Sequence, residues 1–247
     1  MTDTIERADG AEVLDRLVVR FAGDSGDGMQ LTGDRFTSVS ASFGNDLSTL
    51  PDFPAEIRAP AGTINGVSSF QVHISDHDIT TPGDEPNVLV AMNPAALKAD
   101  LGRLETGGTI IVNDDAFDER NLEKVGYREN PLDDSSLATY RVIRVPMSSL
   151  TREVCEPLGV KPRDAERSKN FFALGLVSWM YTRPTEPTLD WIAEKFGKSE
   201  QVAAANREAF LAGYHFGETT EQVGHRYEVQ PAQMPAGEYT SVTGNTA

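Results

Sequence analysis

The sequence predicts an α/β fold, with an open, mostly parallel sheet, helices on both faces and a helical C-terminal part. A short apolar run at residues 17–22 ends at a cluster of glycines, which indicates a buried strand that enters a turn. A second apolar run at residues 87–92 is followed by a helical segment and a third run at residues 109–112. A strand, a helix and a strand at this spacing form a right-handed crossover, so we expect these strands to lie parallel.

The first unit is a strand, a turn and a helix. The strand stops at residues 23–28, which read Gly-Asp-Ser-Gly-Asp-Gly and are called the glycine turn below. From residue 29 to residue 43 apolar side chains recur loosely with a helical period, and Gly44 and Asn45 are available to end that helix.

The middle of the chain predicts a further strand and the crossover helix. Polar and apolar side chains alternate over residues 67–74, which predicts a half-buried strand. After the second apolar run, Asn93 is placed as a helix N-cap and Pro94 at the first helical position. The helix should extend over residues 95–104, before the strand at residues 109–112.

The last part of the chain is predicted to be helical. Residues 114–134 are polar and acidic and predict an exposed excursion before a strand at residues 140–145. The helix at residues 165–181 is apolar nearly all round, so we expect it to be buried in its own domain or against a partner subunit. Further helices are expected at residues 148–158, 189–196 and 200–215.

The chain divides into four parts. Residues 1–16 predict an N-terminal tail, and residues 17–222 form the α/β domain. Residues 223–238 contain prolines and glycines and show no period, which is typical of a linker. Residues 239–247 look like the opening of a further domain.

The charge of the chain is strongly negative. With 22 Lys and Arg against 38 Asp and Glu, the 247 residues carry a formal charge of −16. This charge repels phosphate backbones and anionic lipid heads, which argues against nucleic acid and a membrane surface as partners. The first sixteen residues lack the apolar core of a secretory signal, and no apolar stretch approaches the roughly 20 residues that cross a bilayer. We therefore expect a cytoplasmic protein.

The glycine turn is the first candidate binding site. It follows a strand and precedes a helix, where phosphate-binding turns are found. Its pattern is G-x-x-G-x-G rather than G-x-G-x-x-G, however, and Asp24 and Asp27 would disfavour an approaching pyrophosphate. Its glycines either contact a ligand or only permit a tight turn and close packing.

Arg58 is a second candidate. It lies in a loop rich in Pro and Gly, and loops of this kind often carry binding residues. Its guanidinium could grip a carboxylate or a phosphate through two parallel hydrogen bonds. The alternative is a salt bridge with Glu56 or Asp52.

The sequence predicts no metal site and no nucleophile. His73 and His77 have i,i+4 spacing beside two aspartates, but His73 falls in a predicted strand, and further ligands are not evident. Cys155 is the one cysteine, so an intrachain disulfide and a cluster ligated by four cysteines are both excluded. It is more typical of a small core residue than of a nucleophile, since only Arg152 lies near it as a basic group.

Five segments in order carry a family resemblance: FAGDSGDGM at 21–29, AEIRAPAGT at 55–63, KNFFALG at 169–175, AN at 205–206 and AGY at 212–214. With them the chain resembles the gamma-type domain of 2-oxoacid:ferredoxin oxidoreductases over about residues 17–220. The similar branch is that of the 2-oxoglutarate oxidoreductase alpha subunits. There the domain precedes the pyrimidine-binding domain of a thiamine-diphosphate enzyme, and residues 239–247 are similar to the opening of that domain.

The resemblance implies a hetero-oligomeric assembly with a beta subunit. Such an assembly decarboxylates a 2-oxoacid, with 2-oxoglutarate expected, on thiamine diphosphate and Mg²⁺. It passes electrons through an iron–sulfur cluster to ferredoxin and delivers the acyl group to coenzyme A. This chain lacks a Gly-Asp-Gly…Asn-Asn motif for thiamine diphosphate, so we expect it to bind none of these cofactors alone and to be inactive by itself.

The resemblance also implies roles for particular residues. Thr246 matches a family threonine near the carboxylate of the oxoacid, which makes it the candidate catalytic residue. Which 2-oxoacid is used, and whether the chain is a fragment or a split-gene subunit, the sequence leaves open. A free-standing nucleotide-binding reductase and a non-catalytic acidic interaction subunit remain as alternatives. The positions matched to covering the active site and accommodating coenzyme A are Gly23, Ser25, Gly26, Gly28 and Arg58.

Overall fold

A six-stranded sheet forms the centre of the molecule. The computed structural model describes residues 11–56, 59–233, 235 and 237–238. The strands are β2 (Arg16–Asp24), β3 (Asp46–Asp52), β4 (Val67–Ser75), β5 (Val88–Ala91), β6 (Thr109–Asn113) and β7 (Arg141–Val145). Their order is β3-β4-β2-β5-β6-β7. The strands β2, β5, β6 and β7 pair in parallel, whereas β4 pairs antiparallel with both β2 and β3.

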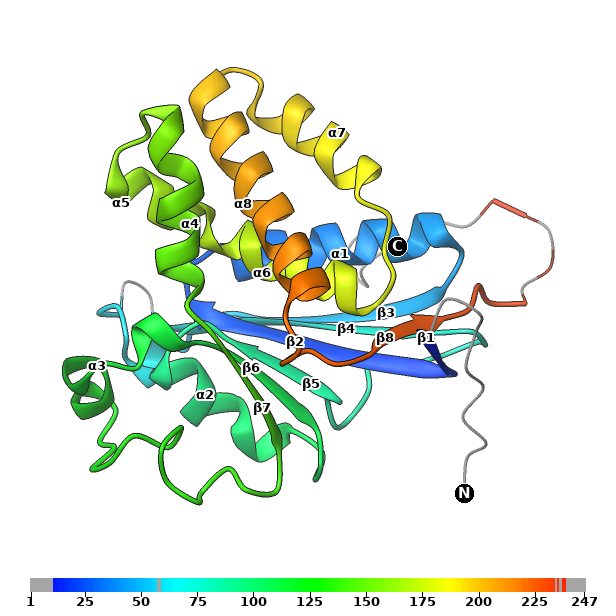
Figure 1. Ribbon diagram of the computed structural model, residues 1–247. Coiled ribbons are helices and arrows are strands. Elements are labelled where there is room, and N and C mark those ends of the chain that lie inside the picture. The colour runs from blue at the N-terminus through cyan, green and yellow to red at the C-terminus, as the bar shows by residue number, and fades with distance from the viewer. Residues whose placement is uncertain (1–10, 57–58, 234, 236, 239–247) are drawn as a thin grey trace.

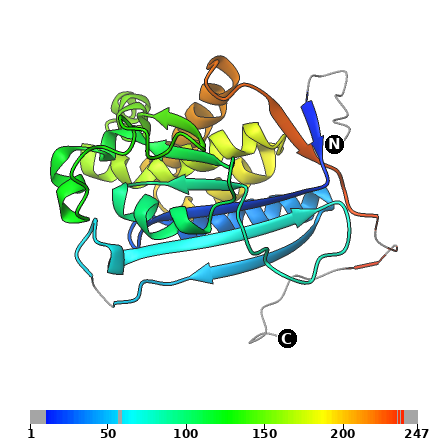
Figure 2. The ribbon, with the colours of Figure 1, turned by 90° about the horizontal axis from the view of Figure 1, so that it is seen from below.

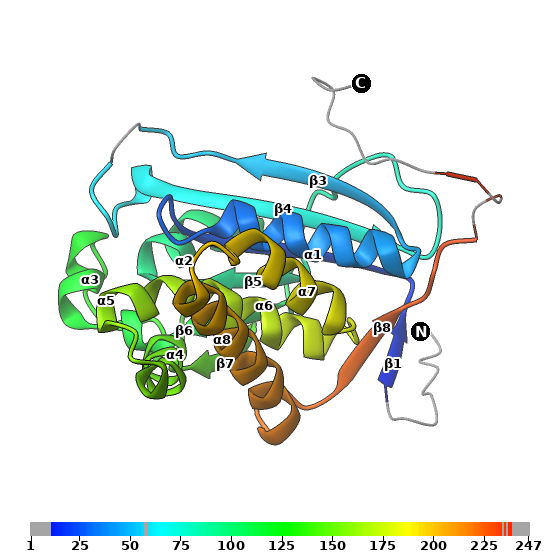
Figure 3. The same cartoon turned by 90° about the horizontal axis from the view of Figure 1, so that it is seen from above.

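Helices cover both faces of this sheet (Figure 1). The larger layer, seen from above in Figure 3, contains α1 (Met29–Phe43), α4 (Met147–Cys155), α5 (Pro162–Ala165), α6 (Lys169–Met180), α7 (Glu186–Phe196) and α8 (Glu200–Thr219). The opposite face carries α2 (Pro94–Asp100) and α3 (Glu119–Lys124), as the view from below shows (Figure 2). The predicted fold class is confirmed, and the three apolar runs of the sequence lie side by side as β2, β5 and β6.

The crossover helix begins as the sequence predicts. The side chain of Asn93 accepts a hydrogen bond from the backbone N–H of Ala96 at 2.9 Å, and Pro94 is the first helical residue. The α-helix is shorter than predicted, because its last turn tightens into a 3₁₀ helix, Leu101–Arg103. The acidic excursion after β6 contains α3, and its Phe117 side chain is buried, so this segment is packed rather than fully exposed.

The polar face of β4 is buried, which corrects the half-buried strand predicted at residues 67–74. The apolar side chains of β4 pack under α1, and its polar side chains bond to a loop on the other face. Gln71 donates to the carbonyl oxygens of Pro82 and Gly83 at 2.8 and 2.7 Å, and a ring nitrogen of His73 lies 2.8 Å from the carbonyl oxygen of Thr81. The strand β3 beside it carries Pro51 and was not predicted; it is an edge strand, where a proline is tolerated.

A small parallel ribbon corrects two other expectations. The predicted tail 1–16 contains β1 (Ala11–Leu14) and the start of β2, and the predicted linker 223–238 contains β8 (Arg226–Val229). The strands β1 and β8 pair in parallel across more than two hundred residues of sequence, so no local pattern could signal the pairing. The Thr182 hydroxyl, just after α6, donates a hydrogen bond to the carbonyl oxygen of Tyr227 in β8 at 2.8 Å.

The helix predicted at residues 165–181 is three consecutive pieces, α5, a 3₁₀ turn (Glu166–Ser168) and α6. Every residue of α6 after Lys169 is buried, as expected from its apolar sequence. It packs closely against α8, because Gly175 and Gly213 let the two backbones approach. Among the helices of the described ranges, none combines the length and apolar character that a membrane span needs.

Candidate functional site

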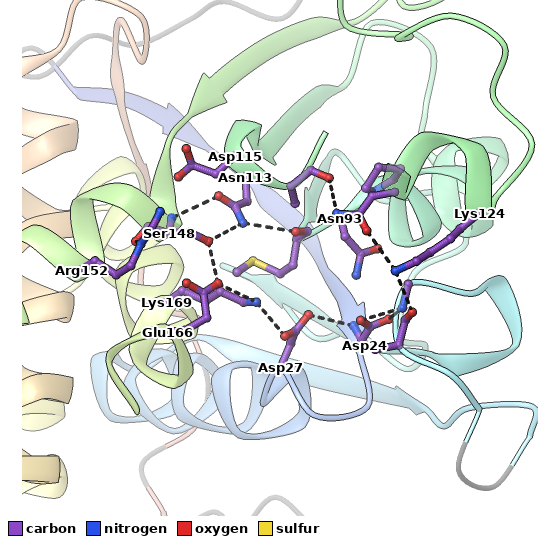
Figure 4. A pocket seen from close by; sticks show the side chains of 16 residues that line it. Asp24, Asp27, Asn93, Asn113, Asp115, Lys124, Ser148, Arg152, Glu166 and Lys169 are labelled. Carbon is purple, nitrogen blue, oxygen red and sulfur yellow. Dashed lines mark hydrogen bonds and ion pairs between the residues drawn. The ribbon is translucent and has the colours of Figure 1, made fainter. Parts of the chain in front are cut away.

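A polar cavity of about 340 Å³ opens at the carboxyl ends of β2, β5 and β6 (Figure 4). Asp24 and Asn113 end β2 and β6, and Asn93 lies two residues beyond the end of β5. These residues lie together because the carboxyl ends of parallel strands meet at one edge of a sheet. Helices close the remaining sides. The other residues that line the polar cavity are Asp27, Ala61, Gly62, Met92, Pro94, Asp115, Ala116, Asn121, Lys124, Ser148, Arg152, Glu166 and Lys169.

The glycine turn forms one wall of this cavity. The backbone N–H of Asp24 donates to the Asp27 carboxylate at 3.0 Å, and the N–H of Asp27 donates to the carbonyl oxygen of Asp24 at 2.8 Å. Across the cavity, the backbone N–H of Gly62 donates to both oxygens of Asp24, at 3.0 and 2.9 Å. Gly28 ends the turn with φ of 75°, a conformation that glycine adopts without strain.

A chain of polar contacts ties the glycine turn to the start of α6 and the end of β6. The Lys169 ammonium lies 3.0 Å from Asp27 Oδ1 and 3.3 Å from Glu166 Oε1. The same Glu166 oxygen accepts a hydrogen bond from the Ser148 hydroxyl at 2.8 Å, and that hydroxyl accepts one from the Asn113 side-chain amide at 3.1 Å. Figure 4 shows these five side chains linked across the floor of the cavity.

Burial and charge shift the titration of two of these groups. Burial raises the pKa of Asp24, and the hydrogen bond from Gly62 offsets this rise only in part. For Lys169, burial acts to lower the pKa, but the neighbouring carboxylates of Asp27 and Glu166 outweigh it and leave the pKa raised. Lys169 therefore stays charged, and both of the carboxylates that it contacts compete for that charge.

The balance of charge in the polar cavity does not favour a phosphate. Lys169 is already paired with two carboxylates, whereas Lys124 and Arg152 bond only to neutral groups within the described ranges. Carboxylates outnumber cations along the lining, so an anion would meet net repulsion. The cations are Lys124, Arg152 and Lys169, and the carboxylates are Asp24, Asp27, Asp115 and Glu166.

A second, larger cavity lies on the other side of the glycine turn. This amphiphilic cavity has a volume of about 570 Å³, and Asp27 lines both cavities. Asn170 is 3% exposed, and its Oδ1 atom has no hydrogen-bond partner among the described residues, although it borders this space. The other lining residues are Gly26, Gly28, Leu31, Gly159, Val160, Lys161, Asp164, Arg167, Ser168, Phe171, Phe196, Gln201, Val202, Ala205 and Asn206.

Comparison with known proteins identifies the family. The model of the pyruvate ferredoxin/flavodoxin oxidoreductase family matches residues 18–216, most of the chain. The chain belongs to this family. A curated relative, the 2-oxoglutarate oxidoreductase subunit KorA of Mycobacterium tuberculosis (strain ATCC 25618 / H37Rv), is 58% identical over 234 residues. That match covers 95% of this chain but 36% of the relative, so the chain spans about a third of the relative's length.

Solved structures of oxoacid oxidoreductases share this fold. The 2-oxoglutarate:ferredoxin oxidoreductase of Magnetococcus marinus, solved with 2-oxoglutarate, coenzyme A and succinyl-CoA, matches 89% of this chain and 34% of its own, at 25% identity and a TM-score of 0.68. The keto/oxoacid ferredoxin oxidoreductase gamma subunit of Geobacter sulfurreducens PCA matches 83% of this chain and 99% of its own, at 18% identity and a TM-score of 0.56. Pyruvate oxidoreductase subunit PORC of Thermotoga maritima matches 82% of this chain and 97% of its own, at 17% identity and a TM-score of 0.52.

The described residues of this family member do not fit a metal or an iron–sulfur cluster. Within the described ranges, no group of three or more His, Cys, Asp and Glu side chains is placed to hold a metal ion. His73 bonds to a backbone carbonyl, and His77 is an exposed side chain beside Asp76. Cys155 is fully buried, and burial raises the pKa of its thiol, which disfavours the reactive thiolate.

The structure separates the site residues that the sequence suggested. Gly26 and Gly28 border the amphiphilic cavity. Gly23 belongs to β2, and the backbone N–H of Ser25 donates to the carbonyl oxygen of Gly66, so these two residues line neither cavity. Arg58 and Thr246 lie outside the described residues.

Sequence reasoning missed the contacts between Lys169, Glu166, Ser148 and Asn113. A signal for Asn113 was present, because it directly follows the apolar run 109–112, and a polar residue there reaches the carboxyl edge of the sheet. No signal exists for Glu166 and Ser148, which meet only because α4 packs against the 3₁₀ turn Glu166–Ser168 that precedes α6.

Proposed function

We propose that this chain is the gamma-type region of the alpha subunit of a 2-oxoacid:ferredoxin oxidoreductase, with 2-oxoglutarate as the oxoacid. In the overall reaction, a 2-oxoacid, coenzyme A and two oxidised ferredoxins give acyl-CoA, CO₂, two reduced ferredoxins and a proton. The identity of 58% to the KorA subunit across 95% of this chain is the observation that carries the proposal. The name of that relative supports 2-oxoglutarate over other oxoacids.

The redox and decarboxylation chemistry belongs to other parts of the assembly. Thiamine diphosphate with Mg²⁺ supplies the carbanion chemistry, and iron–sulfur clusters carry the electrons. The single buried cysteine does not fit a cluster. The sequence has no Gly-Asp-Gly…Asn-Asn motif, so the chain does not fit thiamine diphosphate either. A beta subunit and the remaining alpha-subunit domains are therefore the proposed partners, in a hetero-oligomer that reduces ferredoxin in the cytoplasm.

The role of this chain is to hold coenzyme A beside the active site. The amphiphilic cavity fits an amide-bearing arm, because its lining combines apolar side chains such as Leu31 and Phe171 with amide side chains. Asn170 offers a buried acceptor that has no partner among the described residues, and an amide N–H of the ligand would satisfy it. Gly26 and Gly28 allow the arm close to the backbone, and Arg58 is expected to grip a phosphate or a carboxylate of the ligand.

Reconstitution tests this function. The chain should be purified alone, and also within the complete assembly with its remaining alpha-subunit domains and beta subunit. We expect 2-oxoglutarate and coenzyme A to drive viologen reduction by the assembly, with pyruvate much slower, and the chain alone to be colourless and inactive. Dye reduction by the isolated chain would contradict the proposal that this chain needs the other parts of the assembly for activity. Tight binding of an adenine dinucleotide by an inactive assembly would favour the reductase alternative.

A further inference from the structure

The glycine turn is a wall between two cavities, and two consecutive residues of α6 hold it. Asp27, the last residue but one of the turn, lines both the polar and the amphiphilic cavity. Lys169 contacts Asp27 from the first cavity, while Asn170 lies directly under Gly28. A Cβ atom added to Gly28 would lie 2.7 Å from the Asn170 amide nitrogen, which shows how closely the turn rests on α6.

The lysine in this arrangement invites two opposite interpretations. A lysine beside a glycine-rich turn at the carboxyl edge of a sheet is the arrangement of a phosphate ligand. In this chain, however, Asp27 and Glu166 lie 3.0 and 3.3 Å from its ammonium, and the side chain of Lys169 is 16% exposed. Two carboxylates already neutralise the charge, so little attraction remains for an anionic ligand.

From these contacts we propose that Lys169 is a positioning residue, which fixes the glycine turn through Asp27 and does not itself bind the ligand. This inference rests on the proposed function, because the wall it fixes is the wall of the coenzyme A site. Asp27 uses its two oxygens for two different tasks. One oxygen contacts Lys169, and the other accepts the backbone N–H of Asp24, so the ammonium orients the carboxylate that orders the turn.

The anchor of Lys169 reaches into the sheet. Glu166 contacts Lys169 and also accepts the Ser148 hydroxyl, which is bonded to Asn113 at the end of β6. The Asn113 side chain in turn accepts the backbone N–H of Ser148 at 3.2 Å. These contacts connect the turn to the rigid sheet rather than to a loop. They thereby fix the position of the wall between the two cavities.

Two substitutions show whether Lys169 positions the turn or binds the ligand, because the two roles predict different changes in the affinity for coenzyme A. Lys169→Met removes the cation, and Asp27→Asn removes the carboxylate that it contacts with little change in shape. If Lys169 positions the turn, both changes loosen the wall and weaken coenzyme A binding. If Lys169 binds the ligand, Asp27→Asn frees its charge and removes a repulsive one, so binding becomes tighter.

Two measurements are needed, and the first requires no activity. Hydrogen exchange on the purified chain should show the backbone amides of residues 24–28 exchanging about tenfold faster in both variants. The exposed Lys198→Met and Asp190→Asn serve as matched controls and should leave this exchange unchanged. Unchanged exchange in Lys169→Met and Asp27→Asn would overturn the positioning role, whatever the assembly catalyses.

The second measurement is calorimetric titration of coenzyme A into the complete assembly. We expect the dissociation constant to rise about tenfold in both Lys169→Met and Asp27→Asn. Tighter binding in Asp27→Asn would show that Lys169 is a ligand and would overturn the inference. If the wild-type assembly binds no coenzyme A, the proposed function fails, and the exchange measurement still decides whether Lys169 holds the turn.

Discussion

Arg20 lies in the middle of the apolar strand β2, and its side chain is 1% exposed. Its guanidinium contacts Asp100 on α2 at 2.8 Å and Asp52 at the end of β3 at 2.7 Å. Burial raises the pKa of Asp100, although Arg20 acts in the opposite direction. A charged residue inside a core strand is thus explained by two carboxylates that reach it from distant parts of the chain.

Removing Arg20 should destabilise the fold severely. Arg20→Met leaves the carboxylate of Asp100 buried without its main partner, so we expect a loss of about 3 to 5 kcal/mol in the free energy of unfolding. Urea denaturation measures this loss. Arg103 also contacts Asp100, at 3.6 Å, but its side chain is 56% exposed, and Arg103→Met should cost less than about 1 kcal/mol. Equal losses in the two variants would contradict this account of the buried cluster.

Asp24 should make stability depend on pH in a direction that is unusual for a carboxylate. Its pKa in the folded protein is raised above the ordinary 3.8, mainly by burial, so the native state holds the proton more tightly than the unfolded chain. The resulting stabilisation is complete below the unfolded pKa and is lost as the pH rises through the folded pKa.

Asp24→Asn removes this dependence. The stability of the variant relative to the wild type should therefore increase between about pH 4 and pH 7, as urea midpoints across that range will show. The same substitution at exposed Asp190 serves as the control. A relative stability of Asp24→Asn that is constant, or that falls over this range, would contradict the raised pKa.

The helices α6 and α8 form the closest packing in the larger helical layer. A Cβ atom on Gly175 would lie 1.9 Å from the carbonyl oxygen of Phe210, and one on Gly213 would lie 1.9 Å from that of Phe172. Both contacts are with backbone, which cannot move aside without moving a whole helix. Since α6 also carries Lys169 and Asn170, the position of the glycine turn depends on this packing.

Gly175→Ala and Gly213→Ala should each destabilise the protein. We expect a loss of about 2 to 3 kcal/mol, because one methyl group forces the two backbones apart. Gly102→Ala is the matched control, since a Cβ atom there meets nothing within 4 Å, and its effect should stay within about 0.5 kcal/mol. Thermal and urea unfolding measure both. Alanine tolerated at Gly175 and Gly213 would mean that the helices are farther apart than described.

Elements with a strong local pattern were predictable, and those made by distant contacts were not. The apolar runs gave β2, β5 and β6, and Asn93 with Pro94 gave the start of α2. The edge strand β3 was not predicted, because Pro51 and two aspartates interrupt the pattern of a strand. The ribbon of β1 and β8 was not predicted because its two strands are more than two hundred residues apart in the sequence.

The arrangement of the chain brings its candidate site to one edge of the sheet. Prediction from sequence reached the glycine turn, because a strand followed by glycines and a helix is a local pattern. It did not predict the contact between Asp27 and Lys169, which lie more than a hundred residues apart in the sequence. At the opposite, amino ends of the strands, the Asn87 side chain accepts a hydrogen bond from the Val18 N–H and donates one to Glu105.

The most direct measurement is the kinetics of Gly28→Ala in the complete assembly. Gly28 has φ of 75°, and a Cβ atom there would meet Asn170 at 2.7 Å, so the change distorts the turn where coenzyme A is proposed to lie. Gly126→Ala carries similar strain at φ of 72°, but its Cβ meets only Lys98, at 3.8 Å, outside both cavities. We predict that Gly28→Ala raises the KM for coenzyme A about tenfold, with the KM for 2-oxoglutarate and the Gly126→Ala enzyme little changed. A rise confined to the KM for 2-oxoglutarate, or no change in either KM, would contradict a coenzyme A site at the glycine turn.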